Sequence, residues 1–286
     1  MKDFLFKFIV STIVKLIGRE RAKSLISAIA HSAGLDLLLL AYNNIGILKF
    51  ENDMVSGERY LVTKVLTKNL NCVEQPVIFD VGANVGKYSL LLAKEFPHAE
   101  IYSFEPNENA FKKLVATVGN SVKSVNVGMG SEEKIEKIYT YSDNLSSSHA
   151  SIYKDAFRSY HGTDDVTEIE FQMTTLDNFC ERVNVENIDF LKIDTEGNEL
   201  NALRGASRML SQNRIKIIQF EFGEYDVFSR VFLKDFYAML TNYNIYRLDS
   251  TRLIPLFKYS YSNEIFRYQN FLAVRKDIPF TLEGIR

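Results

Sequence analysis

A short turn that contains glycines and an acidic residue carries the clearest chemical signal in the sequence. Residues 77–81 form an apolar run that includes Asp80, and Gly82 and Gly86 follow before an apolar stretch with helical spacing. A buried strand that turns through glycines into a helix is a nucleotide-binding arrangement, because glycine lets the backbone approach a ligand and the helix N-terminus presents N–H groups. Such turns also serve as plain connections, so the neighbouring residues must decide between the two interpretations.

Two features of this turn favour a sulfonium ligand over a pyrophosphate. Asn84 stands where a dinucleotide-binding turn would have a second close-approach glycine, and Asp80 would repel a phosphate but can pair with a cationic amine or sulfonium. Glu105 follows the second predicted strand, where an acidic side chain can accept hydrogen bonds from both hydroxyls of a ribose. These observations predict S-adenosylmethionine as the cofactor, in preference to NAD. The predicted cofactor-binding residues are Asp80, Gly82, Ala83, Asn84, Gly86, Glu105, Pro106, Asn107 and Asn126.

Carboxylates that follow the later strands are candidates for acid–base chemistry. Asp194 ends a predicted strand and is the first choice as general base, because ligands bind beyond the C-terminal ends of parallel strands. Glu196 is predicted to lie in the first turn of the next helix, where the dipole would stabilise its anion and make it a weaker base. Lys192 is expected to pair with a carboxylate on the same face of its strand. The remaining candidate bases are Glu221 and His149.

Residues 142–152 form a polar, serine-rich segment that is predicted to contact the acceptor. A long polar loop inside a compact α/β domain is more often functional than a plain connection. The residues assigned to acceptor binding are Ser147, Ser148, Glu199 and Glu224. A divalent metal is not favoured, because the sequence contains no compact Asp-rich ligand set.

These side chains require a parallel sheet to bring them together. The first part of the sheet is predicted from strands and helices that alternate along the chain, which indicates a doubly wound α/β fold. The predicted strands are 77–81, 100–104, 123–127, 188–194 and 215–222, and the helices are 85–96, 108–118, one that opens at Thr195, and 231–240. Residues 131–176 form a polar insertion with two strands, 135–141 and 167–174. The last strands, 245–248 and 270–274, would leave one antiparallel strand in the sheet.

Three segments of the sequence form a combined motif: Phe79-Asp-Val-Gly-Ala-Asn-Val-Gly-Lys-Tyr-Ser89, Ser103-Phe-Glu-Pro-Asn107, and Leu191-Lys-Ile-Asp-Thr-Glu-Gly-Asn-Glu199 with Leu203-Arg-Gly-Ala206. Together they resemble the FkbM family of S-adenosylmethionine-dependent methyltransferases. The resemblance covers roughly residues 75–225, and its most specific part is the segment around Asp194. It implies a mostly parallel, seven-stranded class I methyltransferase sheet and transfer of a methyl group to oxygen.

The resemblance also implies a substrate class, namely a sugar hydroxyl of a glycan or glycoconjugate in a polysaccharide pathway. Two alternatives stay open. The acceptor can be a small molecule that is not a glycan, or the chain can be a cofactor-binding scaffold without turnover that docks through its N-terminal helix.

The N-terminal region is expected to form a helical extension over residues 1–70, followed by a methyltransferase domain over 71–286. Residues 1–19 place Lys7, Ser11, Lys15 and Arg19 on one helical stripe between apolar side chains. This pattern fits a helix packed on the protein or on a second subunit, and it also fits peripheral contact with a membrane. Residues 22–50 are interpreted as one or two further packed helices.

Composition excludes some classes of partner. The net charge of −2 gives no indication of nucleic-acid binding. Cys72 and Cys180 fit no metal or redox spacing and indicate free thiols in a reducing compartment. We therefore expect a cytoplasmic protein, in contact with the inner face of the membrane if residues 1–19 bind lipid. A homo-oligomer is compatible with the sequence.

Overall fold

The structure, a computed structural model, describes residues 11–281 except for 13, 148 and 161. It divides into two units, Met1–Ile45 and Gly46–Arg286. The predicted boundary at residue 70 is therefore too late, because α4 (Glu58–Tyr60), the π-helix η1 (Leu61–Leu66) and α5 (Thr67–Leu70) belong with the sheet. Leu61, Leu66 and Leu70 are part of its hydrophobic core.

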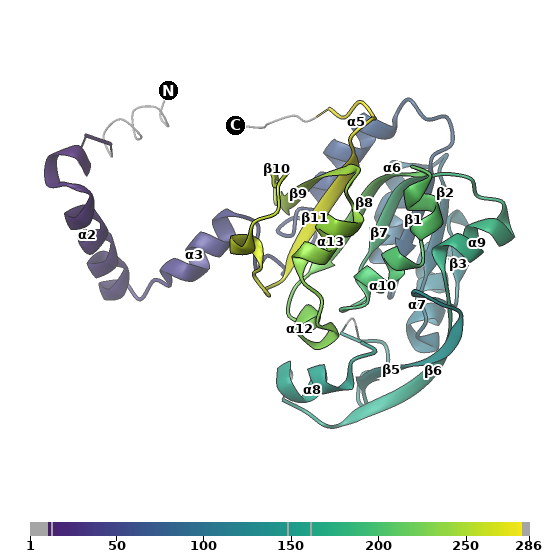
Figure 1. Cartoon of the computed structure of the whole chain (residues 1–286). Coiled ribbons are helices and arrows are strands. Elements are labelled where there is room, and N and C mark those ends of the chain that lie inside the picture. The colour runs from purple at the N-terminus through teal and green to yellow at the C-terminus, as the bar shows by residue number, and fades with distance from the viewer. Residues whose placement is uncertain (1–10, 13, 148, 161, 282–286) are drawn as a thin grey trace. The chain divides into compact units, whose positions relative to one another are not determined.

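An eight-stranded sheet forms the centre of the second unit (Figure 1). Its order is β10-β9-β11-β8-β7-β1-β2-β3. The bounds are β1 Val77–Val81, β2 Glu100–Phe104, β3 Lys123–Val125, β7 Ile188–Ile193, β8 Ile215–Phe222, β9 Tyr243–Asp249, β10 Arg252–Pro255 and β11 Gln269–Arg275. Strand β11 is antiparallel to both of its neighbours, as predicted. Strand β10 was not predicted; it is a four-residue edge strand that ends in a proline, so no alternation identifies it.

Alternate residues along the strands bury into two separate cores, one on each face of the sheet. Phe79 and Leu191 belong to one core, whereas their neighbours Ile78 and Phe190 belong to the other. The first face is covered by α9 (Leu176–Val183), α10 (Glu199–Arg204), α11 (Ser207–Ser211) and α13 (Leu233–Met239). The second face is covered by η1, α5, α6 (Lys87–Glu95) and α7 (Glu108–Val118). This double covering confirms the predicted doubly wound architecture.

A second sheet of three strands, in the order β4-β6-β5, is built from the predicted insertion and the residues just before it. Strands β5 (Lys134–Tyr141) and β6 (Val166–Thr174) pair antiparallel, as predicted, and β4 (Gly128–Met129) pairs parallel to β6. Between β5 and β6 lie the 142–152 loop and α8 (Lys154–Tyr160). Ile138, Phe171 and Met173 form a small core of their own.

In the first unit, α2 (Arg19–Ser32) and α3 (Leu37–Asn44) are helical, and part of the predicted helix over 1–19 lies outside the described residues. The packing expected for residues 22–50 is not found in α3, which has no buried residue. None of the helices that the structure describes is long and apolar enough to cross a membrane by itself. The pair α2 and α3 meets the length and composition criteria together, with a bend of 106° at the break.

Candidate active site

The glycine turn holds the end of β1 against the end of β7. Gly82 has φ of 81°, and a Cβ at this position would lie 1.7 Å from the backbone oxygen of Asp194. Only glycine therefore allows the two segments to approach this closely. The N–H groups of Gly82 and Ala83 donate to the carbonyl of Phe104 at 3.0 and 2.9 Å, so they fix the turn on β2. Gly86, also with positive φ, is the N-cap residue of α6.

Glu105 lies at the end of β2 with one backbone donor on each carboxylate oxygen. Asn84 N–H donates to Oε2 and Asn107 N–H to Oε1, both at 2.8 Å. The side chain is only 5% exposed, and this burial raises the pKa of Glu105 to about 7 although the two N–H groups oppose the shift. A carboxylate oxygen has lone pairs for a second donor, so Glu105 can still accept from a ligand hydroxyl.

A cavity opens beside Glu105. Its polar lining includes Asn84, Glu105, Asp194 and Glu196, and most of the remaining lining is apolar. The apolar walls come from residues that follow β2 and β3 and from the insertion sheet: Pro106, Val127, Met129, Ile138, Phe171 and Met173. The insertion therefore builds one wall of the cavity, a role that its polar composition did not indicate.

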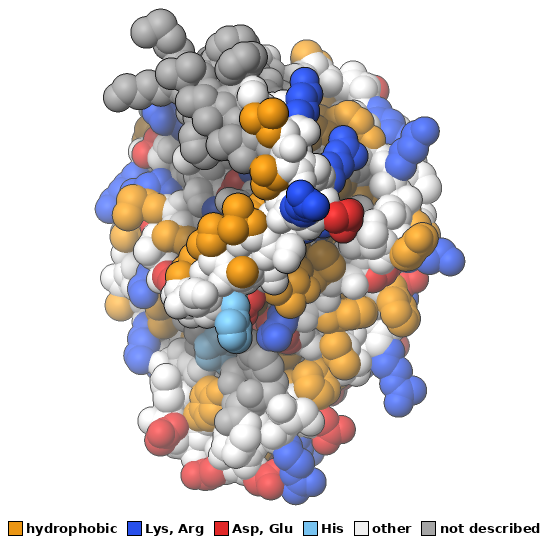
Figure 2. Space-filling model, turned by 90° about the vertical axis from the view of Figure 1, so that its left-hand side faces the viewer, with side chains coloured by type: hydrophobic (Ala, Val, Ile, Leu, Met, Phe, Trp, Pro, Cys, Tyr) orange, Lys and Arg blue, Asp and Glu red, His pale blue; other side chains and the backbone are white. Residues whose placement is uncertain are grey.

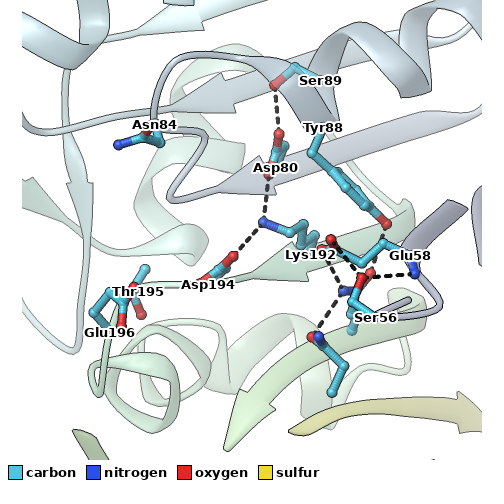
Figure 3. A network of polar contacts seen from close by, with 12 residues as sticks. Ser56, Glu58, Asp80, Asn84, Tyr88, Ser89, Lys192, Asp194, Thr195 and Glu196 are labelled. Atoms are coloured by element: carbon cyan, nitrogen blue, oxygen red, sulfur yellow. Dashed lines mark hydrogen bonds and ion pairs between the residues drawn. The ribbon is translucent and has the colours of Figure 1, made fainter. Parts of the chain in front are cut away.

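Lys192 stands between two carboxylates beneath the turn (Figure 3). Its Nζ lies 2.9 Å from Asp194 Oδ2 and 3.6 Å from Asp80 Oδ1, so the predicted pairing of Lys192 is confirmed. Asp80 is fully buried and also accepts a hydrogen bond from Ser89 Oγ at 2.6 Å. Asp80 does not line the cavity, so its partner is Lys192 and not the ligand cation that the sequence suggested.

A second polar group, which the sequence analysis missed, adjoins Lys192. Tyr88 lies under the Lys192 ammonium, with 4.9 Å from Nζ to the ring centroid, and its hydroxyl donates to Gln219 at 2.7 Å. Gln219 in turn donates to Asn270 at 3.1 Å and to Glu58 Oε1 at 3.4 Å. Burial raises the pKa of Glu58, with Lys192 acting in the opposite direction. No spacing could indicate this group, because Glu58 and Gln219 are 161 residues apart.

A second, larger cavity adjoins the first and has both polar and apolar walls. Its walls include Glu58, Tyr88, His149, Lys192 and Asp194. The two cavities share Gly82, Asn84, Ser147 and Asp194. Asp194 therefore faces both spaces at the point where they meet.

The 142–152 loop closes over the glycine turn and is anchored by side chains that the sequence assigned to the cofactor. Asn84 donates to the carbonyl of Ser147 at 3.2 Å, and Asn107 donates to the carbonyl of Leu145 at 2.6 Å. Asn107 also caps α7, as predicted. Ser147 lines both cavities, and Ser148 lies outside the described residues.

His149 and Glu196 approach each other across the cavities, with 3.9 Å between Nδ1 and Oε1. The predicted helical position of Glu196 is wrong, because α10 begins only at Glu199 and Glu196 has φ of 52° in the preceding loop. Burial and the neighbouring Asp194 raise the pKa of Glu196 well above its usual value, which is opposite to the predicted dipole effect. Partial burial lowers the pKa of His149, although the negative charge of Asp194 acts in the opposite direction and raises it.

The other predicted acids do not line either cavity. Glu199 is buried and accepts from Thr195 N–H at 2.5 Å and Gly197 N–H at 2.9 Å, so it holds the loop before α10 and is not exposed to an acceptor. Glu221 lies on β8 opposite Asn270. Its pKa is raised mainly by burial and, to a smaller extent, by repulsion from Asp194. Glu224 approaches Arg267 at 3.5 Å.

Asn126 is exposed and supports the cavity indirectly. Its amide donates to the carbonyls of Glu105 and Pro106 at 2.8 and 3.1 Å, so it fixes the segment that carries the cavity wall. Within the described part of the chain, no cluster of three or more His, Cys, Asp or Glu residues is arranged to hold a metal ion.

Residues 80–247 match the methyltransferase FkbM domain. The chain belongs to the FkbM methyltransferase family. It is 26% identical over 162 residues to methyltransferase sdnD of Sordaria araneosa, which covers 47% of this chain and 62% of that protein. It is 27% identical over 154 residues to the hexuronic acid methyltransferase AglP of Haloferax volcanii, covering 52% of this chain and 58% of AglP. The chain thus spans less than two thirds of either relative.

Among solved structures, the plantazolicin methyltransferase BpumL in complex with SAH aligns over 90% of this chain and 99% of its own, at 12% identity and a TM-score of 0.42. This member of the S-adenosylmethionine-dependent FkbM family has an α/β sheet with one edge strand more than the seven predicted.

The residues of the first cavity fit this cofactor. Glu105 keeps acceptor capacity for a ribose, and the apolar walls around Met129 and Phe171 suit a flat aromatic base. Asp194 and Asn84 belong to its polar lining and also line the second cavity. When bound, the cofactor supplies an electrophilic methyl group on a sulfonium.

Proposed function

We propose that this enzyme methylates a hydroxyl oxygen of a sugar in a glycan or glycoconjugate. The observation that carries the proposal is the junction of the two cavities at Asp194. An acceptor in the second cavity would present its reacting atom there. The cavity offers carboxylate, amide and hydroxyl groups in quantity, which suits a polyol, and the likeness to a hexuronic acid methyltransferase supports the same class.

In this proposal, Asp194 accepts the proton of the acceptor hydroxyl while the oxygen forms its bond to the methyl carbon and the carbon–sulfur bond breaks. Lys192 holds the Asp194 carboxylate in place at 2.9 Å. Glu196 lines the first cavity but not the second, so it is less suitable as the base, and in this proposal its carboxyl group orients a sugar oxygen.

His149 is the second candidate base. Its lowered pKa leaves the imidazole neutral near pH 7, and it lines the second cavity. Glu58 is placed in the same cavity to accept a hydrogen bond from another hydroxyl of the acceptor.

The proposal is tested by incubating the full chain with methyl-labelled cofactor and three acceptor pools: extracted glycans, lipid-linked sugars and small molecules that are not glycans. We expect the label in a sugar pool, in a linkage that resists mild alkali, because methyl ethers are stable to base. Label that mild alkali releases as methanol would indicate a carboxylate acceptor. Label confined to the non-glycan pool would overturn the sugar assignment.

Two variants then separate the candidate bases. We expect Asp194→Asn to lower kcat by roughly 10²–10⁴-fold, which is the usual contribution of a general base. We expect His149→Gln to retain most of the kcat of the unaltered enzyme. Glu58→Gln should raise KM with a smaller effect on kcat, because in this proposal Glu58 binds the acceptor at a distance from the reacting atoms. Full turnover by Asp194→Asn would exclude Asp194 as the base.

A further inference from the structure

The helix α3 presents apolar side chains on every side and buries none of them. Four consecutive leucines, Leu37–Leu40, are 43–60% exposed. A helix that is apolar all round is stable only when something apolar covers it. Its N-terminal backbone is already satisfied, since Asp36 accepts from the N–H groups of Leu38 and Leu39 at 2.8 and 3.0 Å. Asp36 is therefore a cap at the helix end and does not interrupt the apolar surface.

The preceding helix, α2, is amphipathic with cations beside its apolar face. Leu25, Ile26 and Ile29 are each more than half exposed and lie on one face. At about 100° per residue, Arg19 and Lys23 flank one edge of that face and Arg21 flanks the other. Figure 2 shows this combination over the face turned to the viewer, where Lys and Arg side chains stand beside a run of apolar side chains.

We propose that α2 and α3 form a docking surface for an anionic lipid bilayer and lie in its interface. The leucine and isoleucine side chains would enter the acyl region of the bilayer. The aliphatic parts of the flanking Lys and Arg side chains would lie along the lipid acyl chains, so that their charged groups reach the acidic headgroups. At about 21 Å, α2 is shorter than the hydrocarbon core, and the bend of 106° between the helices suits an arrangement along the surface.

The charges disfavour a second copy of the chain as the occupant. In a symmetric dimer the same patch meets itself, so Arg19, Arg21 and Lys23 would approach the same cations of the partner. The one acid within this stretch of α2, Glu20, already pairs with Lys23 at 2.8 Å. An anionic bilayer has acidic headgroups above an apolar interior, so it is complementary to both the cations and the exposed apolar side chains of α2 and α3.

The test is sedimentation of the full chain with two kinds of vesicle, phosphatidylcholine alone and phosphatidylcholine with phosphatidylglycerol. We expect binding to the anionic vesicles that weakens as salt is added. Replacing Arg19, Arg21 and Lys23 by Gln should reduce it by about fivefold per charge. Leu25→Glu with Ile29→Glu should abolish it. The matched control is Val115→Glu, at a 43% exposed position on α7, which should bind as the unaltered chain does.

Each variant is also checked for cofactor binding and for its melting temperature, so that misfolding is not mistaken for lost docking. Three outcomes would overturn the proposal: no vesicle binding by the intact, folded chain; equal loss of binding with Val115→Glu; or a dimer, seen by analytical ultracentrifugation, that Leu25→Glu with Ile29→Glu dissociates. The last result would assign the surface to self-association.

Discussion

At the scale of single residues, the site depends on one buried cation between two carboxylates. Lys192 is 4% exposed and neutralises both Asp80 and Asp194. Attraction from these acids raises the pKa of Lys192 in spite of its burial, so it remains charged throughout the range in which the protein is folded. Its removal would leave the carboxylates without compensation.

We therefore expect Lys192→Met to lower the free energy of unfolding by about 3–5 kcal/mol, the usual cost of breaking a buried ion pair. Urea titration at pH 7 measures it. The double variant Lys192→Met with Asp80→Asn should recover part of the loss, because the fully buried charge is then absent. Equal stability of the single and double variants would show that Asp80 and Lys192 are not coupled.

Glu105 gives a prediction about pH. With its pKa at about 7 before ligand binds, the carboxylate is mostly protonated at pH 6 and mostly ionised at pH 8. Because only the ionised form accepts freely from ribose hydroxyls, cofactor affinity should rise about tenfold between these pH values. Calorimetry on Glu105→Gln should show a weaker affinity, by about 1–3 kcal/mol, without that rise. The variant also controls for titration of the cofactor itself. If the affinity of Glu105→Gln rose with pH as steeply as that of the unaltered chain, Glu105 would not be the titrating group.

The sequence identified those residues that follow strands, and it missed those that arrive from other segments. Glu105 and Asp194 were found because the ends of parallel strands meet at one edge. Glu58, Tyr88 and Gln219 were not found. They lie at the start of α4, in α6 and in the middle of β8, and no local sequence pattern connects these three positions.

At the scale of elements, the glycine turn is a rigid contact between β1 and β7. We expect Gly82→Ala to unfold more easily and to lose cofactor binding, because its Cβ would collide with the Asp194 carbonyl and positive φ adds strain of roughly 1–3 kcal/mol. Gly119→Ala is the control: φ is 54°, and nothing lies within 4 Å of the new Cβ. It should lose stability through strain alone and keep its cofactor affinity, as thermal melts and calorimetry would show.

The loop before α10 explains why the position of Glu196 was mispredicted. Thr195–Asn198 resembles a helix start, but positive φ at Glu196 and Gly197 delays the helix. The Glu199 carboxylate stabilises this conformation through two backbone N–H groups. The conformation is therefore stabilised by local side-chain-to-backbone hydrogen bonds, which composition does not reveal.

The insertion sheet supplies a prediction of its own. Ile138, Phe171 and Met173 line the cofactor cavity, so occupancy should slow local opening of β5 and β6. Hydrogen exchange with and without S-adenosylhomocysteine would measure this. Amides of β9, which are remote from the cavity lining, serve as the reference and should change less. Equal protection of both regions would indicate a global effect.

At the scale of the whole molecule, the sequence predicted the order of elements more reliably than the limits of the units. The alternation of strands and helices is local and periodic, and it was sufficient to indicate the doubly wound sheet. The boundary at Ile45 depends on whether residues 46–70 find a place in the core, and only the folded structure contains that information.

The position of Glu58 has a consequence for how acceptor choice can diverge among relatives. The family match begins at residue 80, yet the second cavity takes part of its wall from residues 50–59. Under the proposed function, part of the acceptor-binding wall therefore lies upstream of the matched domain. Two proteins with nearly identical domains over 80–247 would then be expected to differ in acceptor preference through this short stretch, and grafting it between them should shift that preference while leaving the methyl donor unchanged.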